Sequence, residues 1–459
     1  MGIFQHPVTG VNKDSLEGSM MSMILDSPEL LRNGPPASLD HVHDLDRESF
    51  ISTMSGHASS TTVRLAEVSG LIEGYSTARA EQLWGTTAMQ KHFTSHKTKS
   101  CDSSWTPCML YNAKTMNSVT SDISQAQSIE SLVNYPERLA VLTSYRCNYK
   151  CIMCPLHHVK TESLPESVLD KLEPIFPFIK KLVLSGGEPL LDKNWVRWFF
   201  SGAQNGVSCE MNTNGSLLCG DVNRILAETA DVINISIDAA TDKTYRLIRG
   251  AALKNIFSNI DDLVSKCAAT RRQLKICFRF VAMSENIEEL TKVVSIAARL
   301  GVRHISVCYL RVHTEDMVQQ SLFFHKERSD YHMCKAKEVA RHLGVEITLP
   351  QLFSDTSHEP DVKSARGICK DPWKYLEVAP NGATGLCCGF AGQGGNIITD
   401  SFSDVWNHAQ KKLIRKTVNS AKPVAPCDAC MVGKTLDPNS RASHLTPSIL
   451  DTMEENLPH

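Results

Sequence analysis

The sequence lacks several features that would decide its class at once. It carries 48 Lys and Arg against 50 Asp and Glu, a formal net charge of -2, so no overall field favours nucleic acid or an anionic membrane. It contains no apolar run long enough to span a bilayer. Residues 1–9 lack the basic-then-apolar order of a signal peptide. We therefore expect a cytoplasmic protein with no nucleic-acid or membrane partner.

Cysteine, by contrast, is abundant. The chain has 16 cysteines, and without an export signal a reducing compartment and metal ligation explain them better than disulfides. Its 459 residues, 42% apolar and 21% charged, are typical of a globular protein of two or three domains.

Residues 1–135 are the least informative part and are interpreted as an N-terminal extension. Val63–Trp84 has apolar residues at helical spacing and predicts an amphipathic helix. The polar stretch Ser95–Ser128 is typical of a linker. It holds Cys101 and Cys108, which are either incidental thiols or a metal pair, and no second pair with zinc spacing stands nearby.

From residue 136 to 312, strand-like and helix-like runs alternate, which predicts a parallel sheet with right-handed crossovers. The predicted strands are Leu139–Ser144, Lys181–Ser185, Val207–Asn212, Asp231–Asp238, Leu274–Met283 and Val302–Leu310. The predicted helices are Glu166–Glu173, Lys193–Ala203, Leu253–Ala268 and Ile287–Leu300, the last with Asn286 and Glu289 spaced as a capping box. A partial barrel and a doubly wound sheet both fit this order.

Two of these strands predict a ligand cavity. Asn234, Ser236 and Asp238 share one face of the fourth strand, whereas a strand covered by helices on both sides is apolar on both faces. Arg279 takes an inner position on the fifth strand. A buried arginine needs an anionic partner, and a ligand carboxylate would serve.

Three cysteines follow the first predicted strand. Cys147, Cys151 and Cys154 have C-x3-C-x2-C spacing, and three thiolates on one loop can hold three irons of a [4Fe–4S] cluster and leave the fourth iron open. A zinc site is the alternative, with His157 or His158 as the fourth ligand.

A glycine pair follows the second predicted strand, in Ser185-Gly186-Gly187-Glu188-Pro189. Glycines let a backbone approach a ligand closely, and the carbonyls of this turn with Glu188 would receive an amino group. Taken alone, the pattern also suits a plain strand-to-helix turn.

A second cysteine set follows a connecting insertion, residues 313–364. Residues 365–435 contain a predicted hairpin at Asn381-Gly382 and a predicted helix, Phe402–Val418; the tail is 436–459. Four thiolates can bind a closed cluster, and a structural zinc is the alternative. The four cysteines are Cys369, Cys387, Cys427 and Cys430, with Cys388 as a spare neighbour.

The cysteine loop, the glycine turn and the Ser236–Asp238 strand end together resemble the radical S-adenosylmethionine (radical SAM) superfamily. The resemblance covers about residues 138–310 and implies a partial (β/α)6 TIM-type barrel. It also implies a [4Fe–4S] cluster whose open iron binds the amino and carboxylate groups of SAM. An electron from the cluster then cleaves SAM to a 5′-deoxyadenosyl radical, which abstracts a hydrogen atom from the substrate.

The resemblance also implies roles for single residues. Glu188 would bind the SAM amino group, Gly186 and Gly187 would give backbone contacts, and Arg279 would meet the SAM carboxylate. At the other end of SAM, Ser236 and Asp238 match the ribose position. Met153 takes the place where the family usually has a bulky residue on adenine.

The second cysteine set is similar to the auxiliary-cluster extension of the same family, called SPASM in its long form and twitch in its short one. Gly382-x4-Cys387 matches the hairpin of that extension. Full SPASM domains have more cysteines after the helix, so the one-cluster form fits better. The cofactors implied are SAM, a SAM-binding [4Fe–4S] cluster and a second, auxiliary [4Fe–4S] cluster, with flavodoxin or ferredoxin as electron donor.

We therefore expect a radical SAM enzyme of oxidoreductase or isomerase type, acting on a sugar-like or aminocyclitol-like metabolite in natural-product biosynthesis. Cys308, near the end of the sixth predicted strand, is a candidate hydrogen donor, although buried apolar cysteines are common in such places. Tyr309, Arg311 and His313 are candidate substrate contacts. The alternatives are maturation of a ribosomally made peptide, with residues 1–135 recognising its leader, and a zinc protein without catalysis.

Overall fold

The protein is described from a computed structural model, which covers the residues from 107 onward with gaps. The described residues are 107–159, 162–270, 273–355, 368–387, 392, 394–428, 430, 438–446 and 448–449. The helix predicted at Val63–Trp84, Cys101, most of the predicted N-terminal extension, Cys388 and the side chains of His157 and His158 lie outside these residues. By its contacts the chain divides into two compact units, Met1–Thr115 and Met116–His459. Apart from residues 107–115 of the first helix, the features below belong to the second.

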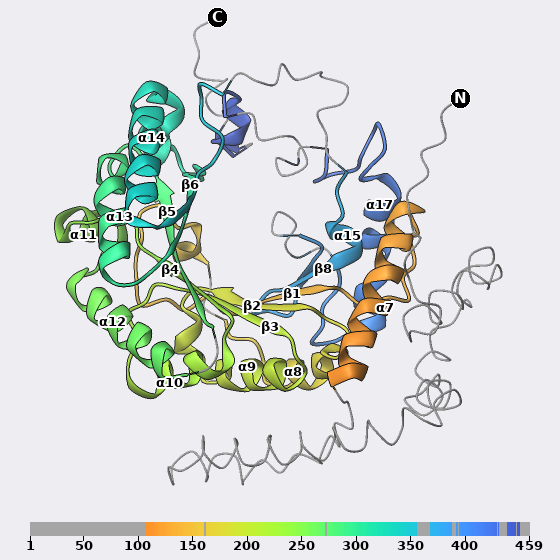
Figure 1. Ribbon diagram of the computed structural model, residues 1–459. Helices are drawn as coiled ribbons and strands as arrows, with labels where there is room; N and C mark the ends of the chain where they lie inside the picture. Colours follow the sequence, from red (N-terminus) through yellow and green to blue (C-terminus); the bar gives the residue numbers. More distant parts are fainter. Residues whose placement is uncertain are drawn as a thin grey trace, which may run out of the picture. The chain divides into compact units, whose positions relative to one another are not determined.

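One curved sheet organises this second unit (Figure 1). Its strand order is β7-β6-β5-β4-β3-β2-β1-β8-β9, and every neighbouring pair is parallel except β8 with β9. The strands are β1 (Arg138–Ser144), β2 (Lys181–Gly186), β3 (Ser208–Thr213), β4 (Val232–Ser236), β5 (Lys275–Ala282), β6 (His304–Tyr309), β7 (Glu346–Thr348), β8 (Tyr375–Val378) and β9 (Thr384–Gly385). The six predicted strands are confirmed, and the sheet is the open, mostly parallel arrangement of a partial barrel.

Helices cover the outer side of the sheet from α8 round to α14 (Figure 1). The α-helices are α7 (Pro107–Ala126), α8 (Ser167–Leu172), α9 (Trp195–Gln204), α10 (Gly220–Thr229), α11 (Asp242–Arg249), α12 (Lys254–Ala269), α13 (Leu290–Arg299), α14 (Lys326–Leu343), α15 (Asp371–Lys374), α16 (Phe402–Trp406) and α17 (Ala409–Thr417). In the described part of the chain, no helix has the length and apolar character needed to cross a membrane.

Strand alternation separates an apolar outer face from a polar inner one. On β4, Ile233 and Ile235 are fully buried in the main core beneath the helices, whereas Asn234 and Ser236 point to the inner side of the sheet. Burial of such side chains stabilises the fold by about 1.5–3 kcal/mol each. The inner face is therefore left for polar contacts.

Three further strands, β7, β8 and β9, extend the sheet beyond the predicted six. β7, from the predicted connecting insertion, pairs with β6. β8, from the predicted auxiliary domain, pairs with β1 over Arg138–Val141. The predicted hairpin at Asn381-Gly382 is confirmed, since β8 and β9 are antiparallel and Gly382 has a φ of 79°. The hairpin thus continues the barrel sheet.

Three local predictions were wrong. The stretch Ser95–Ser128, predicted as a linker, is helical from Pro107 to Ala126, where it forms α7. Glu289 does not close a capping box with Asn286, because its carboxylate accepts hydrogen bonds from the backbone nitrogens of Ala240 and Thr241, at 2.6 and 2.9 Å. The helix predicted at Phe402–Val418 is two helices, broken at Asn407. The side-chain amide of Asn407 accepts a hydrogen bond from Leu132 N and donates one to Leu132 O. At Glu289 and at Asn407, hydrogen bonds to residues distant in sequence therefore override the local pattern on which the prediction was based.

Candidate active site

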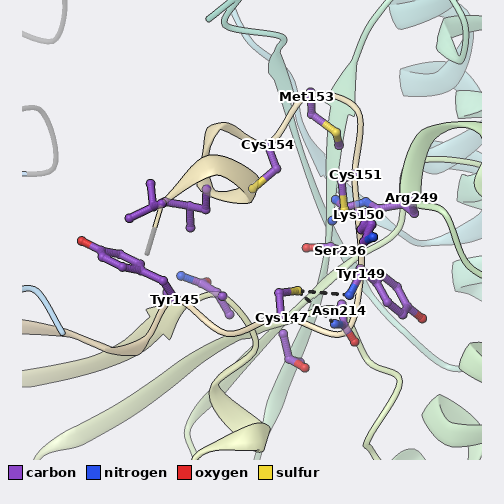
Figure 2. A pocket seen from close by; sticks show the side chains of 16 residues that line it. Tyr145, Cys147, Tyr149, Lys150, Cys151, Met153, Cys154, Asn214, Ser236 and Arg249 are labelled. Atoms are coloured by element: carbon purple, nitrogen blue, oxygen red, sulfur yellow. Dashed lines mark hydrogen bonds between the residues drawn. The ribbon is translucent and has the colours of Figure 1, made fainter. Parts of the chain in front are cut away.

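The loop after β1 brings its three cysteines to one cavity. Cys147, Cys151 and Cys154 line a cavity of about 630 Å³, and Figure 2 shows their sulfur atoms facing the same space. Met153 and Ser236, both predicted to contact SAM, also line it. The volume falls in the usual range for ligand and cofactor pockets, so there is room for a cluster with a bound small molecule.

The glycine turn touches this loop through its backbone. Gly187 N donates to Ser144 O at 2.7 Å, and a Cβ on Gly187 would lie 2.1 Å from Arg146 O. Gly186 has a φ of 118°, and a Cβ there would lie 2.4 Å from Ser144 O. Only glycine permits this approach, and both glycines line the cavity as predicted.

Glu188 lies behind the cavity instead of lining it. Its carboxylate is buried and accepts hydrogen bonds from Thr213 Oγ1 (2.8 Å), Asn214 N (2.7 Å) and Leu190 N (3.2 Å). Burial raises the pKa of Glu188, and these three donors oppose that shift. The structure therefore gives this side chain the role of fixing Thr213 and Asn214 at the end of β3; binding of the SAM amino group stays a prediction.

Asp238 is also buried, in an ion pair with Arg249. Arg249 ends α11, lines the cavity, and donates from NH1 to Cys151 Sγ at 3.5 Å. The prediction that Asp238 contacts ribose is not tested, but its carboxylate already binds Arg249 and the backbone nitrogen of Val281.

Among the residues at this cavity that sequence reasoning missed, Arg249 and Asn214 contact cysteine sulfurs. Asn214 donates from Nδ2 to Asn148 Oδ1 at 2.8 Å and lies 3.9 Å from Cys147 Sγ. Arg249 comes almost a hundred residues after the cysteine it contacts, so no local spacing could reveal the pair. Its position beside Gly250, in a helix C-terminal motif, gave the only local signal.

Arg279 is not buried, contrary to the premise of its prediction. Its side chain is 46% exposed, it donates to Asn234 Oδ1 at 3.0 Å and Ser306 Oγ at 2.8 Å, and it does not line the 630 Å³ cavity. Neutral polar groups on the neighbouring strands satisfy part of its guanidinium, and its NH2 lies 4.0 Å from Glu210 Oε1, an anionic partner within the protein. Contact with a ligand carboxylate remains a prediction.

Cys308 has an exposed thiol one strand away from Arg279. Surrounding protein atoms raise the pKa of this thiol, so it stays protonated at neutral pH, as a hydrogen donor must. Nothing in the structure tests that role.

Arg311 and His313 line a smaller cavity of about 120 Å³ that shares Met153 and Cys154 with the larger one. Burial and Arg311 lower the pKa of His313.

The second cysteine set lies beside the inner face of the barrel. Cys387 packs against Ala140, Val183 and Tyr375, inner-face residues of β1, β2 and β8. Burial raises the pKa of Cys369 to about 11, with smaller contributions from the neighbouring Cys427 and Cys430. Three of the four predicted ligands are thus neighbours, and the fourth faces the barrel.

The backbone at Cys369 is fixed by one side chain. Asn419 accepts from Cys369 N at 2.9 Å and donates to Cys369 O at 3.0 Å. Within the described ranges no group of three or more His, Cys, Asp or Glu side chains is arranged around a single metal ion. The donors at both sites are thiols, which suit iron–sulfur clusters, so both cysteine sets fit such groups.

Two family models match the chain. Residues 141–297 match the Radical SAM superfamily and residues 369–431 match an iron–sulfur cluster-binding domain, SPASM. The two matches contain both cysteine sets, the glycine turn, Ser236, Asp238 and Arg279.

Named relatives are distant. A probable GTP 3′,8-cyclase of Metallosphaera sedula is 24% identical over 45% of this chain, which spans 63% of that relative's length. An AdoMet-dependent heme synthase of Methanosarcina barkeri is 23% identical over 65% of this chain and 90% of its own length.

Among solved structures, Streptococcus suis SuiB bound to S-adenosylmethionine shares the fold with a TM-score of 0.53. The match has 14% identity and covers 73% of this chain and 81% of SuiB. The two family matches account for a SAM-binding [4Fe–4S] site and an auxiliary iron–sulfur site. The chain belongs to the radical SAM superfamily and carries a SPASM iron–sulfur cluster-binding domain.

Proposed function

We propose that this enzyme removes a hydrogen atom from a small, polar, anion-bearing metabolite bound on the inner face of the barrel, leading to oxidation or epimerisation at carbon. The observation that carries the proposal is the continuous polar network on that face. In a parallel sheet covered on both sides these positions would be apolar.

The network joins five strands. Glu210 accepts from Lys181 at 3.1 Å and from Asn234 at 2.7 Å, and Asn234 in turn accepts from Arg279. Ser306 accepts from the far side of Arg279. Because Arg279 keeps nearly half of its side chain exposed, its guanidinium can bind an anionic group of a substrate without losing these contacts.

A second cation points to the same substrate chemistry. Arg138 on β1 stacks over the ring of Tyr375 on the inner side of the sheet, with its guanidinium carbon 5.2 Å from the ring centre. Glu210 and Glu377 oppose these cations. An inner face with charges of both signs suits a substrate such as an amino sugar, an aminocyclitol or a phosphorylated sugar better than an apolar one.

When bound, the first cluster and SAM supply a radical that abstracts hydrogen, and the second cluster supplies an electron acceptor. The chain's own residues hold and orient these groups. We infer that Gly186, Gly187, Ser236 and Met153 contact SAM, because all four line the cavity. Cys308 would return a hydrogen atom in an epimerisation.

The names of the relatives agree with a polar substrate. One is a probable GTP 3′,8-cyclase and another an AdoMet-dependent heme synthase. GTP carries several anionic groups. At 23–24% identity, these names support the class of chemistry and do not identify the substrate of this chain.

The test is deuterium transfer. The reconstituted enzyme is incubated with SAM, a reductant such as reduced flavodoxin, and deuterated amino sugars, aminocyclitols and sugar phosphates. We expect deuterium in 5′-deoxyadenosine with one of these classes. The Arg279→Gln variant should lower this transfer while SAM cleavage without substrate continues, because Arg279 does not line the cavity of the cysteine loop. Loss of SAM cleavage as well would instead support the contact with the SAM carboxylate.

A matched control is Arg197→Gln, which removes a surface arginine paired with Glu166 and Asp170. It should leave deuterium transfer unchanged. Equal transfer in Arg279→Gln and the control would contradict a substrate site at Arg279.

Peptide maturation is the second candidate. The SuiB structure bound to its precursor peptide SuiA covers 71% of this chain at a TM-score of 0.51 and 14% identity, which supports a shared fold. Deuterium transfer from a labelled peptide, with none from small metabolites, would favour this candidate.

A further inference from the structure

A buried ion pair stands directly behind the cluster loop. Both Nε and NH2 of Arg249 contact Oδ2 of Asp238, whose carboxylate has no exposed surface. Asp238 Oδ1 accepts a further hydrogen bond from Val281 N at 2.7 Å. These bonds hold the guanidinium in one orientation, since two of its nitrogens bind the same carboxylate.

The remaining nitrogen of Arg249 is directed at a cluster ligand. NH1 donates to Cys151 Sγ at 3.5 Å, in a contact that is buried on both sides. Cys151 is the one buried thiol of the three, whereas Cys147 is exposed and Cys154 intermediate. The positive charge therefore faces the sulfur that water screens least.

The loop is attached to the same helix end by its backbone. Ile152 N donates to Ile248 O at 2.9 Å, one residue before Arg249. A Cβ on Gly250, the residue after Arg249, would lie 3.5 Å from Lys150 O. Arg249 and Cys151 are thus held at a fixed separation by main chain as well as by side chain.

We propose that Arg249 and Asp238 set the reduction potential of the cluster held by Cys147, Cys151 and Cys154, with Arg249 raising it and Asp238 limiting the increase. Reduction adds one negative charge to a cluster. A guanidinium beside Cys151 Sγ stabilises the reduced form, and hydrogen bonds to cluster sulfurs act in the same direction. Asp238 opposes this effect from behind Arg249, at a greater distance from the sulfur.

The hydrogen-bond donors at Cys147 differ from Arg249 in charge. Cys147 Sγ accepts from Tyr149 N at 3.4 Å and lies 3.9 Å from Asn214 Nδ2, and both of these donors are neutral. Charge-assisted hydrogen bonds are roughly twice as strong as neutral ones. The proposal concerns the cluster and is independent of the substrate proposed above.

Two substitutions of similar shape test the proposal with opposite signs. Arg249→Gln keeps an amide donor and removes the charge, so the potential should fall. Asp238→Asn removes the opposing charge, so the potential should rise. Arg246→Gln, on the exposed side of the same helix and paired there with Asp242, is the control and should leave the potential unchanged.

The measurement is a redox titration of the reconstituted full-length protein without SAM, followed by the electron paramagnetic resonance signal of the reduced clusters. The signal of the SAM-binding cluster is identified in parallel samples as the one that changes when SAM is added. We expect each charge substitution to change the reduction equilibrium by roughly tenfold, about 59 mV for one electron.

Unchanged potentials at normal iron content, or shifts of the same sign in both variants, would overturn the proposal. If Asp238→Asn fails to hold iron, Arg249→Lys replaces it as the second test. This variant keeps the positive charge, so its reduction potential should lie closer to that of the unaltered protein than the potential of Arg249→Gln does. Loss of iron in all three variants would leave the pair a purely structural role and would also overturn it.

Discussion

At the scale of single residues, the structure separates the groups that line the cavity from those that hold them. The three cysteines, both glycines and Ser236 could be predicted because their chemistry is tied to short spacings. Glu188 and Asp238 were predicted as direct ligands of SAM, yet both carboxylates are buried behind the cavity. Sequence spacing places a residue at a strand end. It does not tell whether hydrogen-bond donors elsewhere in the fold already bind the carboxylate of that residue.

Glu188→Gln tests the supporting role of this carboxylate. An amide cannot accept from all three of its donors, so at least one buried N–H or O–H loses its partner, at a cost of about 1–3 kcal/mol. We expect a lower unfolding temperature together with weaker SAM binding by equilibrium dialysis. Glu338→Gln, on an exposed part of α14, is the control. An unfolding temperature equal to the control's would contradict this role.

Lys411 provides a pH-dependent prediction. This lysine is fully buried and donates to Thr384 Oγ1 at 3.1 Å. Burial, followed by repulsion from Arg415, lowers its pKa well below the ordinary value. Between the folded and unfolded pKa values the unfolded chain binds the proton more tightly. The free energy of unfolding should therefore rise with pH, by at most about 1.4 kcal/mol per pH unit.

The Lys411→Met variant should lose this rise and gain stability at pH 7. Unfolding temperatures at pH 7 and pH 9 measure both effects, and Lys416→Met, at an exposed position of the same helix, is the control. The same pH dependence in Lys411→Met and in the control would show that Lys411 does not titrate in this range.

At the scale of elements, the order of strands and helices was predictable and their partners were not. Alternating apolar residues located β1 to β6. By contrast, the pairing of β8 with β1 depends on a contact between segments more than 230 residues apart. The split between α16 and α17 likewise follows from Asn407 bonding Leu132, a tertiary contact that helical periodicity does not contain.

The contact between the glycine turn and the cysteine loop is the element-scale feature most sensitive to mutation. Gly187→Ala would place a methyl group 2.1 Å from Arg146 O, so the turn or the loop must move. We expect SAM cleavage to fall by at least roughly tenfold, equivalent to about 1.4 kcal/mol, with loss of iron from the first site.

Gly206→Ala is the matched control for that substitution. Gly206 has a φ of 61° and open space around its Cβ position, so alanine there costs only about 1–2 kcal/mol of backbone strain. It should retain iron and SAM cleavage. Equal losses in both variants would mean that general destabilisation, and not the close approach at Gly187, causes the effect.

At the scale of the whole molecule, inner-face residues of the sheet adjoin the first cysteine set and one member of the second. The first set lies at the carboxyl end of β1, and Cys387 of the second packs against the inner residues of β1, β2 and β8. Sequence alone predicted the two sets and their families, while their common face depends on β8 joining the barrel.

This arrangement predicts different losses for the two sets. Replacing Cys147, Cys151 and Cys154 by Ala should abolish SAM cleavage. Replacing Cys427 and Cys430 by Ala should leave some cleavage but little product, if the second cluster accepts the substrate's electron. Normal product from the second variant would refute that role for the auxiliary site.

The measurement that tests the central claim most directly is iron content and 5′-deoxyadenosine formation by the anaerobically reconstituted full-length protein. With two four-iron clusters, the account predicts about eight irons per chain and 5′-deoxyadenosine after SAM and reductant are added. It also predicts that the Cys147, Cys151 and Cys154 triple variant keeps only the second cluster's iron and forms no 5′-deoxyadenosine. Two bound zinc ions per chain and no 5′-deoxyadenosine from the unaltered protein would contradict it.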